Sequence, residues 1–243
     1  MIEPKLILVG AGPGDPELIS VKGLKALQAA DVVMYDALVS EELLQHAPKA
    51  VKVFCGKRAG THYMKQDEIN RQIVEHAQRY GTVVRLKGGD PFIFGRGQEE
   101  LEYAEKHGIP TAIIPGISSA TALATSRKIP LTKRGITESV WVTTGTTSCG
   151  ALSDDIELAA QSSATVVILM GIGKLPEIVK VFLKYKPATY PMAIIQNGTL
   201  PDEKVVCGHL VTIQDKVDKE NITAPAIIIV GEVVDCSLIA LLK

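Results

Sequence analysis

Positively charged side chains in this sequence gather in short loops that are flanked by glycine or proline. They are Lys57, Arg58, Lys87, Arg96, Lys133 and Arg134. The chain as a whole carries a formal net charge of -1, so these loops are not part of a generally basic surface. Several charged hydrogen bonds of about 1.5–3 kcal/mol each would hold a ligand with several negative charges. The loops therefore predict a site for a polyanionic small molecule, with solvated basic turns as the structural alternative.

Carboxylates accompany these cations. Asp36 ends the apolar run Val32–Tyr35, and Glu99 follows Arg96 by three residues. An acid at the end of a strand can cap the next helix, or it can serve as a base that faces a bound substrate. The residue pattern leaves both roles open for Asp36.

The segment Leu86–Glu100, LKGGDPFIFGRGQEE, combines both signs of charge with bare backbone. Gly88 and Gly89 stand next to each other where an apolar run ends, and glycines there let the backbone approach a ligand closely. Loops at the carboxyl ends of parallel strands often bind ligands. We therefore expect this segment to belong to a binding site.

A glycine-rich turn, Val9–Pro16, follows the first apolar run and invites a dinucleotide-binding interpretation. A GxGxxG pattern that begins at Gly10 would need glycine where Asp15 stands. Pro13 also removes an N–H that would contact a pyrophosphate. A nicotinamide-dependent dehydrogenase, with Asp36 on the ribose, is therefore disfavoured but stays a competing function. A non-catalytic binding protein for a polycarboxylate is the other competing function.

Strand-like and helix-like segments that would position these loops alternate along the first half. Strands are expected over Lys5–Val9, Asp31–Tyr35, Val51–Phe54, Val83–Leu86 and Thr111–Ile114. Helices are expected over Glu17–Ala30, Glu41–Ala47, Gln66–Tyr80 and Gln98–Lys106. Strands that are apolar on both faces and separated by helices predict a largely parallel sheet.

The second half continues this alternation after a helical segment, Ser118–Ser126. Strands are expected over Val140–Thr143, Val166–Met170, Met192–Gln196, Val205–Ile213 and Ala226–Val230, and helices over Leu152–Ala160 and Leu175–Lys184. Lys128–Thr137 is the best candidate for a linker. The predicted fold class is α/β, with two α/β domains at residues 1–130 and 131–243 and a ligand site in the cleft between them.

Composition narrows the class of protein further. The chain has 243 residues, and 46% of them are hydrophobic, which is ample for packed cores. Its longest apolar runs are far shorter than the about 20 residues that a membrane span needs, and its N-terminus lacks the basic region of a signal peptide. We expect a soluble cytoplasmic protein without nucleic-acid or membrane partners.

Cysteine and histidine spacing gives no sign of a metal site. The four cysteines lie far apart, at Cys55, Cys149, Cys207 and Cys236, and the five histidines show no HxxxH or HxH spacing. No metal is expected, and the thiols are predicted to be reduced.

Taken together, these loops strongly resemble those of the tetrapyrrole methylase family. The matching motifs occur in the family's order across about the whole chain: VGAGPGDPEL (9–18), YDALVS (35–40), GKRAG (56–60), LKGGDPFIFGRGQEE (86–100), PGISSATA (115–122), IPLTKRG (129–135), LMG (169–171), QNGT (196–199) and PAIIIVGEVV (225–234). The resemblance implies a two-domain fold with S-adenosylmethionine in the interdomain cleft, no metal, and a homodimer. Lys133 stands where the family often has histidine.

The resemblance is greatest to the family members that methylate uroporphyrinogen III. It implies transfer of methyl groups from S-adenosylmethionine to ring carbons C2 and C7 of this tetrapyrrole. The products would be precorrin-2, formed through precorrin-1, and S-adenosylhomocysteine, in sirohaem or cobalamin biosynthesis. The many carboxylates of such a substrate account for the basic loops better than a dinucleotide does. Another precorrin methyltransferase is the alternative within the family.

Site residues follow from the resemblance, position by position. Cofactor contacts are implied for Pro13, Gly88, Gly89, Asp90, Ile93, Ser118, Ser119, Met170, Gly198 and Ala226. Asp36 is implied as the proton acceptor and Lys57 as a proton donor. Arg96, Glu99 and Arg134 would line the substrate pocket, so that the N-terminal domain holds the substrate and part of the cofactor. Alternatively, Arg96 or Glu99 transfers the proton and Asp36 only orients the substrate.

Overall fold

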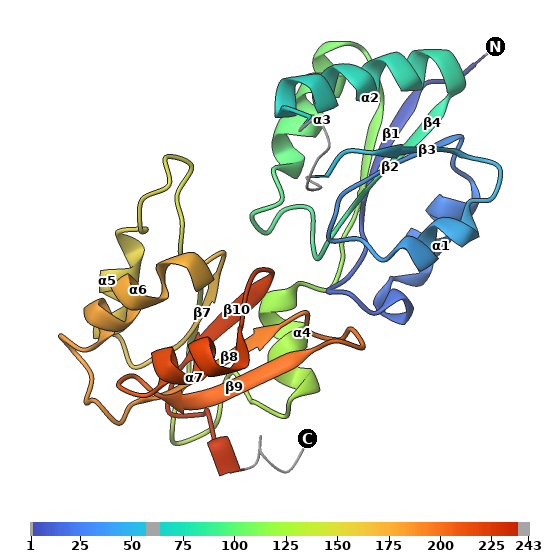
Figure 1. The fold of residues 1–243 in the computed structure, drawn as a ribbon. Coiled ribbons are helices and arrows are strands. Elements are labelled where there is room, and N and C mark those ends of the chain that lie inside the picture. Colours follow the sequence, from blue (N-terminus) through green and yellow to red (C-terminus); the bar gives the residue numbers. More distant parts are fainter. Residues whose placement is uncertain (1, 57–63, 238–243) are drawn as a thin grey trace. The chain divides into compact units, whose positions relative to one another are not determined.

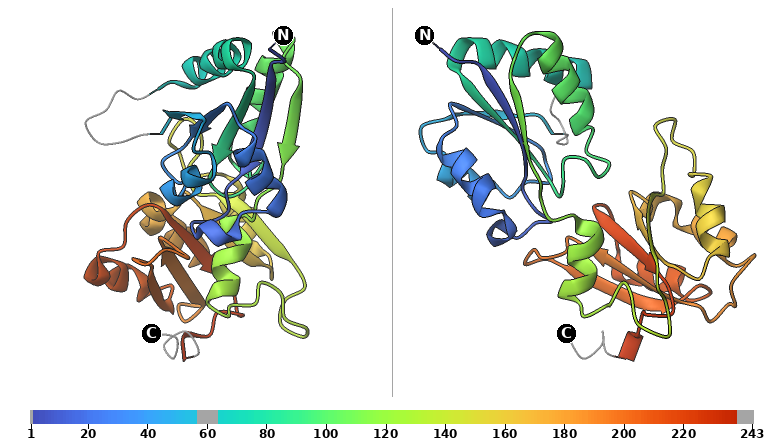
Figure 2. Two further views of the ribbon diagram at one scale, coloured as in Figure 1. Left: turned by 90° about the vertical axis from the view of Figure 1, so that its right-hand side faces the viewer. Right: turned by 180° about the vertical axis from the view of Figure 1, so that it is seen from behind.

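The chain forms two compact α/β units, each with its own five-stranded sheet (Figures 1 and 2). The computed structural model describes residues 2–56 and 64–237. The first unit is Met1–Ser118 and the second is Ser119–Lys243. The mixed α/β class and the two-part organisation agree with the prediction from the sequence.

The sheet of the first unit is entirely parallel. Its strands are β1 (Lys5–Gly10), β2 (Val32–Tyr35), β3 (Val51–Phe54), β4 (Thr82–Lys87) and β5 (Thr111–Ile114), in the spatial order β3-β2-β4-β1-β5. All of these neighbouring strands pair in parallel. The predicted parallel sheet is therefore confirmed for this unit.

Successive residues of these strands pack into two different cores. In β4, Val83 belongs to the cluster beneath the helices α2 (Gln66–Tyr80) and α3 (Gly97–Lys106). Its neighbour Val84 belongs to the cluster on the opposite face, which includes residues of α1 (Val21–Gln28) and the 3-10 helix η2 (Glu41–His46). The alternation of side chains along a strand explains this division. It also sends Arg85 and Lys87 of β4 to the same face as Val83, toward α2 and α3.

The helix expected over Glu17–Ala30 is shorter than predicted. A 3-10 turn, η1 (Pro16–Leu18), comes first, and the chain is extended at Ile19 before α1 begins. Ser20 supplies the cap, because its hydroxyl oxygen accepts a hydrogen bond from the N–H of Gly23 at 3.0 Å. A capping serine inside an apparently continuous helical pattern marks the true start of the helix.

The sheet of the second unit is mixed. Its strands are β6 (Val140–Thr144), β7 (Thr165–Leu169), β8 (Pro191–Gln196), β9 (Lys204–His209) and β10 (Ala226–Val230), in the order β6-β7-β10-β8-β9. Strands β6 and β7 pair in parallel, whereas β10 runs antiparallel to both of its neighbours and β8 antiparallel to β9. Apolar runs alone do not reveal strand direction, so the sequence did not predict this mixture.

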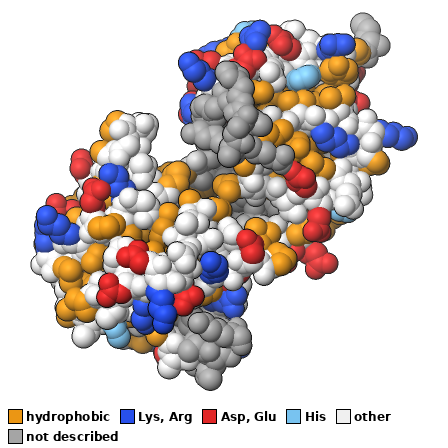
Figure 3. All heavy atoms as spheres, in the orientation of Figure 1, with side chains coloured by type: hydrophobic (Ala, Val, Ile, Leu, Met, Phe, Trp, Pro, Cys, Tyr) orange, Lys and Arg blue, Asp and Glu red, His pale blue; other side chains and the backbone are white. Residues whose placement is uncertain are grey.

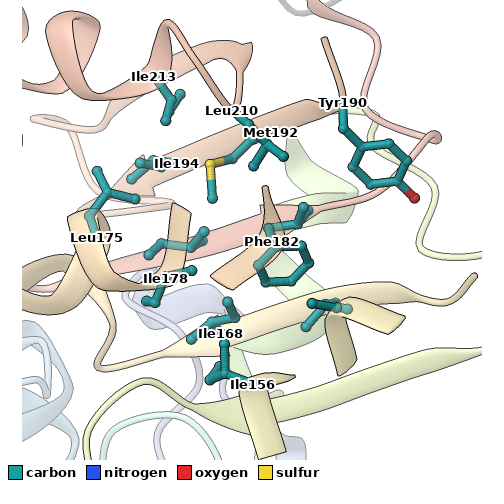
Figure 4. Packing of buried hydrophobic residues seen from close by; sticks show 14 of the residues in the cluster. Ile156, Ile168, Leu175, Ile178, Phe182, Tyr190, Met192, Ile194, Leu210 and Ile213 are labelled. Atoms are coloured by element: carbon teal, nitrogen blue, oxygen red, sulfur yellow. The ribbon is translucent and has the colours of Figure 1, made fainter. Parts of the chain in front are cut away.

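Helices cover both faces of the second sheet. One face packs on α5 (Asp155–Gln161), α6 (Leu175–Phe182) and α7 (Ile213–Glu220), and Figure 4 shows the core beneath them around Ile178, Phe182 and Met192. The other face packs on α4 (Ser119–Ser126), whose Leu123 lies in a cluster with residues of β7, β8 and β10. This packing places α4 in the second unit, so the division falls at Ser118 rather than at residue 130.

Helix α7 was not predicted. The run Val205–Ile213 was expected to be one strand, but β9 ends at His209 and the helix begins at Ile213. Leu210, Ile213 and Val217 all reach the same core, at helical spacing. An apolar run that continues from a strand into the buried side of a helix therefore concealed the boundary.

Two cysteines differ from their predicted state. Cys207 of β9 and Cys236 form a disulfide across a separation of 29 residues, so the prediction of reduced thiols is wrong for this pair. Spacing alone does not show which distant cysteines meet in the fold. Cys55 is a buried free thiol and Cys149 an exposed one.

Among the described helices, none has the length and apolar character required to cross a membrane.

Three glycines of the first unit lie in direct backbone contact. A Cβ atom added at Gly116 would lie 2.2 Å from the carbonyl oxygen of Gly89 and 2.6 Å from the Cα of Gly10. Backbone atoms on both sides leave no side chain that could move away. These glycines are therefore required by the packing of three loops, whether or not a ligand binds nearby.

We expect Gly116→Ala to lower the free energy of unfolding by about 1–3 kcal/mol, the usual cost of forcing extra atoms into a packed site. Urea unfolding followed by circular dichroism measures this change. The matched control is Gly173→Ala, where an added Cβ meets nothing within 4 Å. Equal unfolding midpoints for the two variants would contradict the packing argument.

Candidate active site

Loops at the carboxyl edge of the first sheet are tied to one another. Gly89, after β4, donates its N–H to the carbonyl oxygen of Gly12, after β1, at 2.6 Å, and the reciprocal bond measures 3.3 Å. Asp90 Oδ2 accepts the N–H of Gly116, after β5, at 3.0 Å. Near this junction, residues 17–20 and residues 115–117 line a pocket of about 340 Å³. The edge therefore gathers the loops that contain Pro13, Gly88 to Asp90 and Ser118.

Asp90 has a clear structural task in this arrangement. Its second oxygen, Oδ1, accepts the N–H of Phe92 at 2.8 Å, so both oxygens bind backbone groups. Gly88 is equally constrained, because an added Cβ would lie 2.7 Å from the Cβ of Leu38. Both residues were predicted to contact the ligand, and the structure shows that they hold the loop in shape.

The loop after Asp90 is strained and partly apolar at its surface. Phe92, Ile93 and Phe94 are all exposed. Phe94 and Arg96 have left-handed backbone conformations, with φ of 54° and 58°. Non-glycine residues seldom adopt such conformations, and those that do cluster at functional sites. These features favour a binding role for the loop.

Arg96 and Glu99 form a bidentate ion pair at the start of α3. Arg96 Nε lies 2.9 Å from Glu99 Oε1, and Nη2 lies 2.7 Å from Oε2. The hydrogen bonds from Arg96 lower the pKa of Glu99 below its ordinary value. The pair is about half exposed, so it can meet a ligand at the protein surface. The structure thus brings together two residues that the sequence analysis placed in the substrate pocket.

A buried charged cluster lies behind the carboxyl end of β2. Arg85 Nη2 binds Asp36 Oδ1 at 2.5 Å, and Lys87 Nζ lies 3.7 Å from Asp36 Oδ2. Burial lowers the pKa of Arg85, but the carboxylates of Glu100 and Asp36 together raise it above its ordinary range. Burial also raises the pKa of the Cys55 thiol to about 11, so this neighbour stays uncharged.

Neither Arg85 nor Glu100 was predicted to be a site residue. A signal was present, since Arg85 and Lys87 interrupt an apolar strand at alternate positions and so share one face. A charged side chain on a buried face needs a partner. Glu100, at 0% exposure on α3, is that partner. Lys57, the expected proton donor, lies outside the described residues.

The second unit places three predicted residues at one edge of its sheet. Met170 follows β7 and Gly198 follows β8, while Ala226 opens β10. Because β10 is antiparallel to both strands, its first residues pair with their last ones: Ala226 with Gln196, and Ile227 with Leu169. The structure therefore brings Met170, Gly198 and Ala226 to the same edge.

Strained backbone also marks this edge. Met170, Asn197 and Thr199 have left-handed conformations, with φ of 53°, 49° and 68°. The carbonyl oxygen of Met170 accepts a hydrogen bond from the Thr146 hydroxyl at 2.8 Å, and the side chain is exposed. Gly198 packs on Leu123, whose Cγ would lie 2.2 Å from an added Cβ. Bare, fixed backbone of this kind suits a ligand that is held largely by main-chain groups.

Other predicted residues lie apart from this edge or at the boundary between units. Arg134 is exposed in the turn closed by Lys133 and Thr137, before β6 begins. The Thr137 hydroxyl binds the carbonyl of Ser163, just before β7, so this turn lies at the strand ends opposite Met170. Ser118 ends the first unit and Ser119 opens the second.

Within residues 2–56 and 64–237, the structure contains no group of three or more histidine, cysteine, aspartate or glutamate residues that could bind a metal ion.

Charges of both signs are mixed on the surface. Figure 3 shows Lys and Arg side chains interspersed with Asp and Glu on the face that it draws. This mixture matches the formal net charge of -1. Lys87, expected in a ligand-facing loop, is instead buried at the end of β4 and paired with Glu100, whereas Arg96, Lys133 and Arg134 are exposed. A ligand must therefore recognise individual exposed side chains.

Comparison with known proteins gives extensive matches. The family described as Tetrapyrrole (Corrin/Porphyrin) Methylases matches residues 5–214. A uroporphyrinogen-III C-methyltransferase of Methanocaldococcus jannaschii is 49% identical over 234 residues, which cover 95% of this chain and 97% of the relative. The chain spans about half the length of the siroheme synthases that it also matches.

Solved structures agree with the sequence matches. The uroporphyrin-III C-methyl transferase of Thermus thermophilus, complexed with S-adenosylhomocysteine, superposes with a TM-score of 0.81 at 38% identity and covers 94% of this chain and 98% of that one. A cobalt precorrin-4 methyltransferase superposes with a TM-score of 0.85 at 30% identity and covers 95% of this chain and 96% of that one.

Proposed function

The chain belongs to the tetrapyrrole methylase family, and from this premise we propose that it is a uroporphyrinogen-III C-methyltransferase. The reaction transfers methyl groups from S-adenosylmethionine to C2 and C7 of uroporphyrinogen III and yields precorrin-2, through precorrin-1, with S-adenosylhomocysteine. The observation that carries this function is the 49% identity to a relative of that name, over 95% of this chain and 97% of the relative. The proposal extends to a cytoplasmic homodimer that serves sirohaem or cobalamin synthesis.

S-adenosylmethionine is the co-substrate in this proposal. The Thermus relative is complexed with S-adenosylhomocysteine, the product that remains after methyl transfer. Pro13, Gly88, Gly89, Asp90, Ile93, Ser118, Ser119, Met170, Gly198 and Ala226 are the proposed contacts. The left-handed backbone at Met170, whose side chain is exposed, and the bare backbone at Gly198, which packs on Leu123, fit a ligand bound through main-chain atoms. The domain roles follow, with the substrate and part of the cofactor assigned to the first unit.

Methyl transfer needs orientation more than acid catalysis. The sulfonium loses its methyl group as a neutral thioether, so no acid is required to expel it. Alignment of the attacking carbon, the methyl group and the sulfur supplies much of the rate. After the pyrrole carbon attacks, a proton must leave the macrocycle, and this step calls for a base. We assign that role to Asp36, whose side chain is 28% exposed and held by Arg85. Lys57 is the proposed proton donor.

The substrate carries several carboxylates, and the proposed pocket residues are Arg96, Glu99 and Arg134. We expect Arg96→Ala to raise the KM for uroporphyrinogen III about tenfold, because one charge-assisted hydrogen bond of about 1.5 kcal/mol is lost. Steady-state kinetics at saturating S-adenosylmethionine measure this change. Arg71→Ala, which removes an exposed arginine paired with Glu68, is the control. A KM that stays equal in both variants would remove Arg96 from the substrate pocket.

Product mass gives the direct test of the function. The protein is incubated anaerobically with uroporphyrinogen III and S-adenosylmethionine, and a product with two added methyl groups is expected. Calorimetry should show binding of S-adenosylhomocysteine and none of NAD. Binding without turnover of uroporphyrinogen III, but with methylation of a precorrin, would assign the chain to another tetrapyrrole substrate. Absence of S-adenosylhomocysteine binding would refute the methyltransferase.

A further inference from the structure

Glu100 has two carboxylate oxygens with very different surroundings. Its Oε1 lies 3.2 Å from Arg85 Nε and 2.9 Å from Lys87 Nζ. The amide nitrogen of Gln66, on α2, also donates to Oε1 at 3.1 Å. The other oxygen, Oε2, is buried and has no hydrogen-bond partner within residues 2–56 and 64–237. A buried carboxylate with this arrangement needs an explanation beyond packing.

The cations that bind Glu100 also bind the proposed base. Arg85 bridges Glu100 to Asp36 through Nε and Nη2, and Lys87 lies between the same two acids. The exposed fractions of the side chains are 0% for Glu100, 2% for Arg85 and 5% for Lys87, against 28% for Asp36. Asp36 is thus the one member of these four that a substrate can reach.

We propose that Glu100 is a positioning residue for methyl transfer, which fixes Arg85 and Lys87 against Asp36 and offsets one of their two positive charges. The inference rests on the proposed function, in which Asp36 accepts the proton. Two adjacent cations strongly favour the charged form of a carboxylate, and a carboxylate held in that form is a weak base. A second carboxylate that the substrate cannot reach offsets part of the positive charge next to Asp36. It does not compete with Asp36 for the proton of the substrate.

The other groups around the cluster do not supply this balance. Cys55, after β3, is held neutral by burial, which raises its pKa to about 11. On α2, Gln66 and Asn70 are uncharged and hydrogen-bond to each other at 2.9 Å. Glu99 of α3 also feels the charge of Lys87, but it is half exposed and engaged by Arg96. Glu100 is therefore the buried anion of this cluster that offsets one of the two positive charges.

Glu100→Gln tests the proposal with little change in shape. The amide oxygen can keep the three donors now on Oε1, and the amide nitrogen takes the place of the unpartnered Oε2. We expect the acid limb of the pH profile for methyl transfer to move about one pH unit lower, since two cations then face Asp36 alone. The plateau rate should fall about tenfold. Binding of S-adenosylhomocysteine should stay unchanged, and Glu102→Gln on the exposed side of the same helix is the control.

A second substitution separates charge from shape. Adding Lys87→Met to Glu100→Gln leaves one cation for one carboxylate, and we expect the acid limb to return toward that of the unsubstituted protein. If Glu100 had only a structural role, the losses of methyl-transfer rate caused by the two substitutions would add instead. If Glu100→Gln does not fold, Lys87→Met alone still tests the balance, because it should move the acid limb to higher pH.

The outcomes distinguish this inference from the function on which it rests. An unsubstituted protein that methylates no tetrapyrrole would refute the proposed function and the role of Glu100 with it. If the unsubstituted protein is active and Glu100→Gln leaves the acid limb in place, the role of Glu100 alone is overturned. An acid limb that does not move in Lys87→Met would have the same meaning.

Discussion

Replacement of Asp36 by asparagine should reduce methyl transfer by at least about 100-fold, the lower end of what a positioned base contributes. Asparagine keeps the shape of the side chain but cannot accept the proton that must leave the macrocycle. The substitution also leaves Arg85 with a neutral partner at the 2.5 Å contact. Single-turnover rates with uroporphyrinogen III measure the effect, and binding of S-adenosylhomocysteine should be retained because none of the proposed cofactor contacts changes.

Asp67→Asn is the matched control for this experiment. Asp67 lies in the first turn of α2 and is exposed, so its loss should cost only a few tenths of a kcal/mol in stability and leave the rate unchanged. If Asp36→Asn proceeds at the unsubstituted rate, Asp36 is not the base. The alternative assignment would then hold, with proton transfer by Arg96 or Glu99 and Asp36 orienting the substrate.

Arg85→Met is expected to lower the free energy of unfolding by about 3–5 kcal/mol, as removal of one partner from a buried ion pair commonly does. Without Arg85, Lys87 is the one cation left in this cluster to pair with two carboxylates, those of Asp36 and Glu100. The carboxylate of Glu100 is 0% exposed, so water cannot compensate its charge. Urea unfolding at neutral pH measures the change. Arg71→Met is the control, because its ion pairs are exposed and such pairs contribute about 1 kcal/mol or less.

The double variant Arg85→Met with Glu100→Gln sharpens this second prediction. If the cost arises from an uncompensated buried carboxylate, removal of that charge should recover part of the lost stability. A double variant as unstable as the sum of both single variants would instead assign the cost to lost packing. A destabilisation by Arg85→Met no larger than that of Arg71→Met would show that the cluster contributes little to stability.

Much of the first unit could be predicted because its strands are apolar on both faces. Such strands, with helices between them, have few arrangements other than a parallel sheet. The second unit was less predictable, since β8 and β10 are also apolar but pair antiparallel to each other, and β8 pairs antiparallel to β9. Direction depends on which strands meet, and that information is not local. The Cys207–Cys236 pair was missed for the same reason.

The site shows a similar limit. Local composition identified the exposed loop residues, such as Arg96 and Glu99, because glycines and charges after a strand are visible in a single sequence. The buried cluster was not identified, because Arg85 and Glu100 come from different elements and gain their meaning only when α3 packs on β4. Gly88 and Gly89 were interpreted as room for a ligand, whereas Gly89 also makes room for Gly10 and Gly116.

The position of β10 has a consequence for how the protein is made. This strand is the last one within residues 2–56 and 64–237, yet it lies in the middle of its sheet, between β7 and β8. During synthesis, the first sheet has all its strands once Ile114 has left the ribosome, whereas the second lacks its central strand until Val230 has emerged. Once β8 is complete at Gln196, the nascent second unit therefore carries two strand edges, on β7 and β8, that stay unpaired until β10 emerges, and prompt synthesis of β10 limits their aggregation.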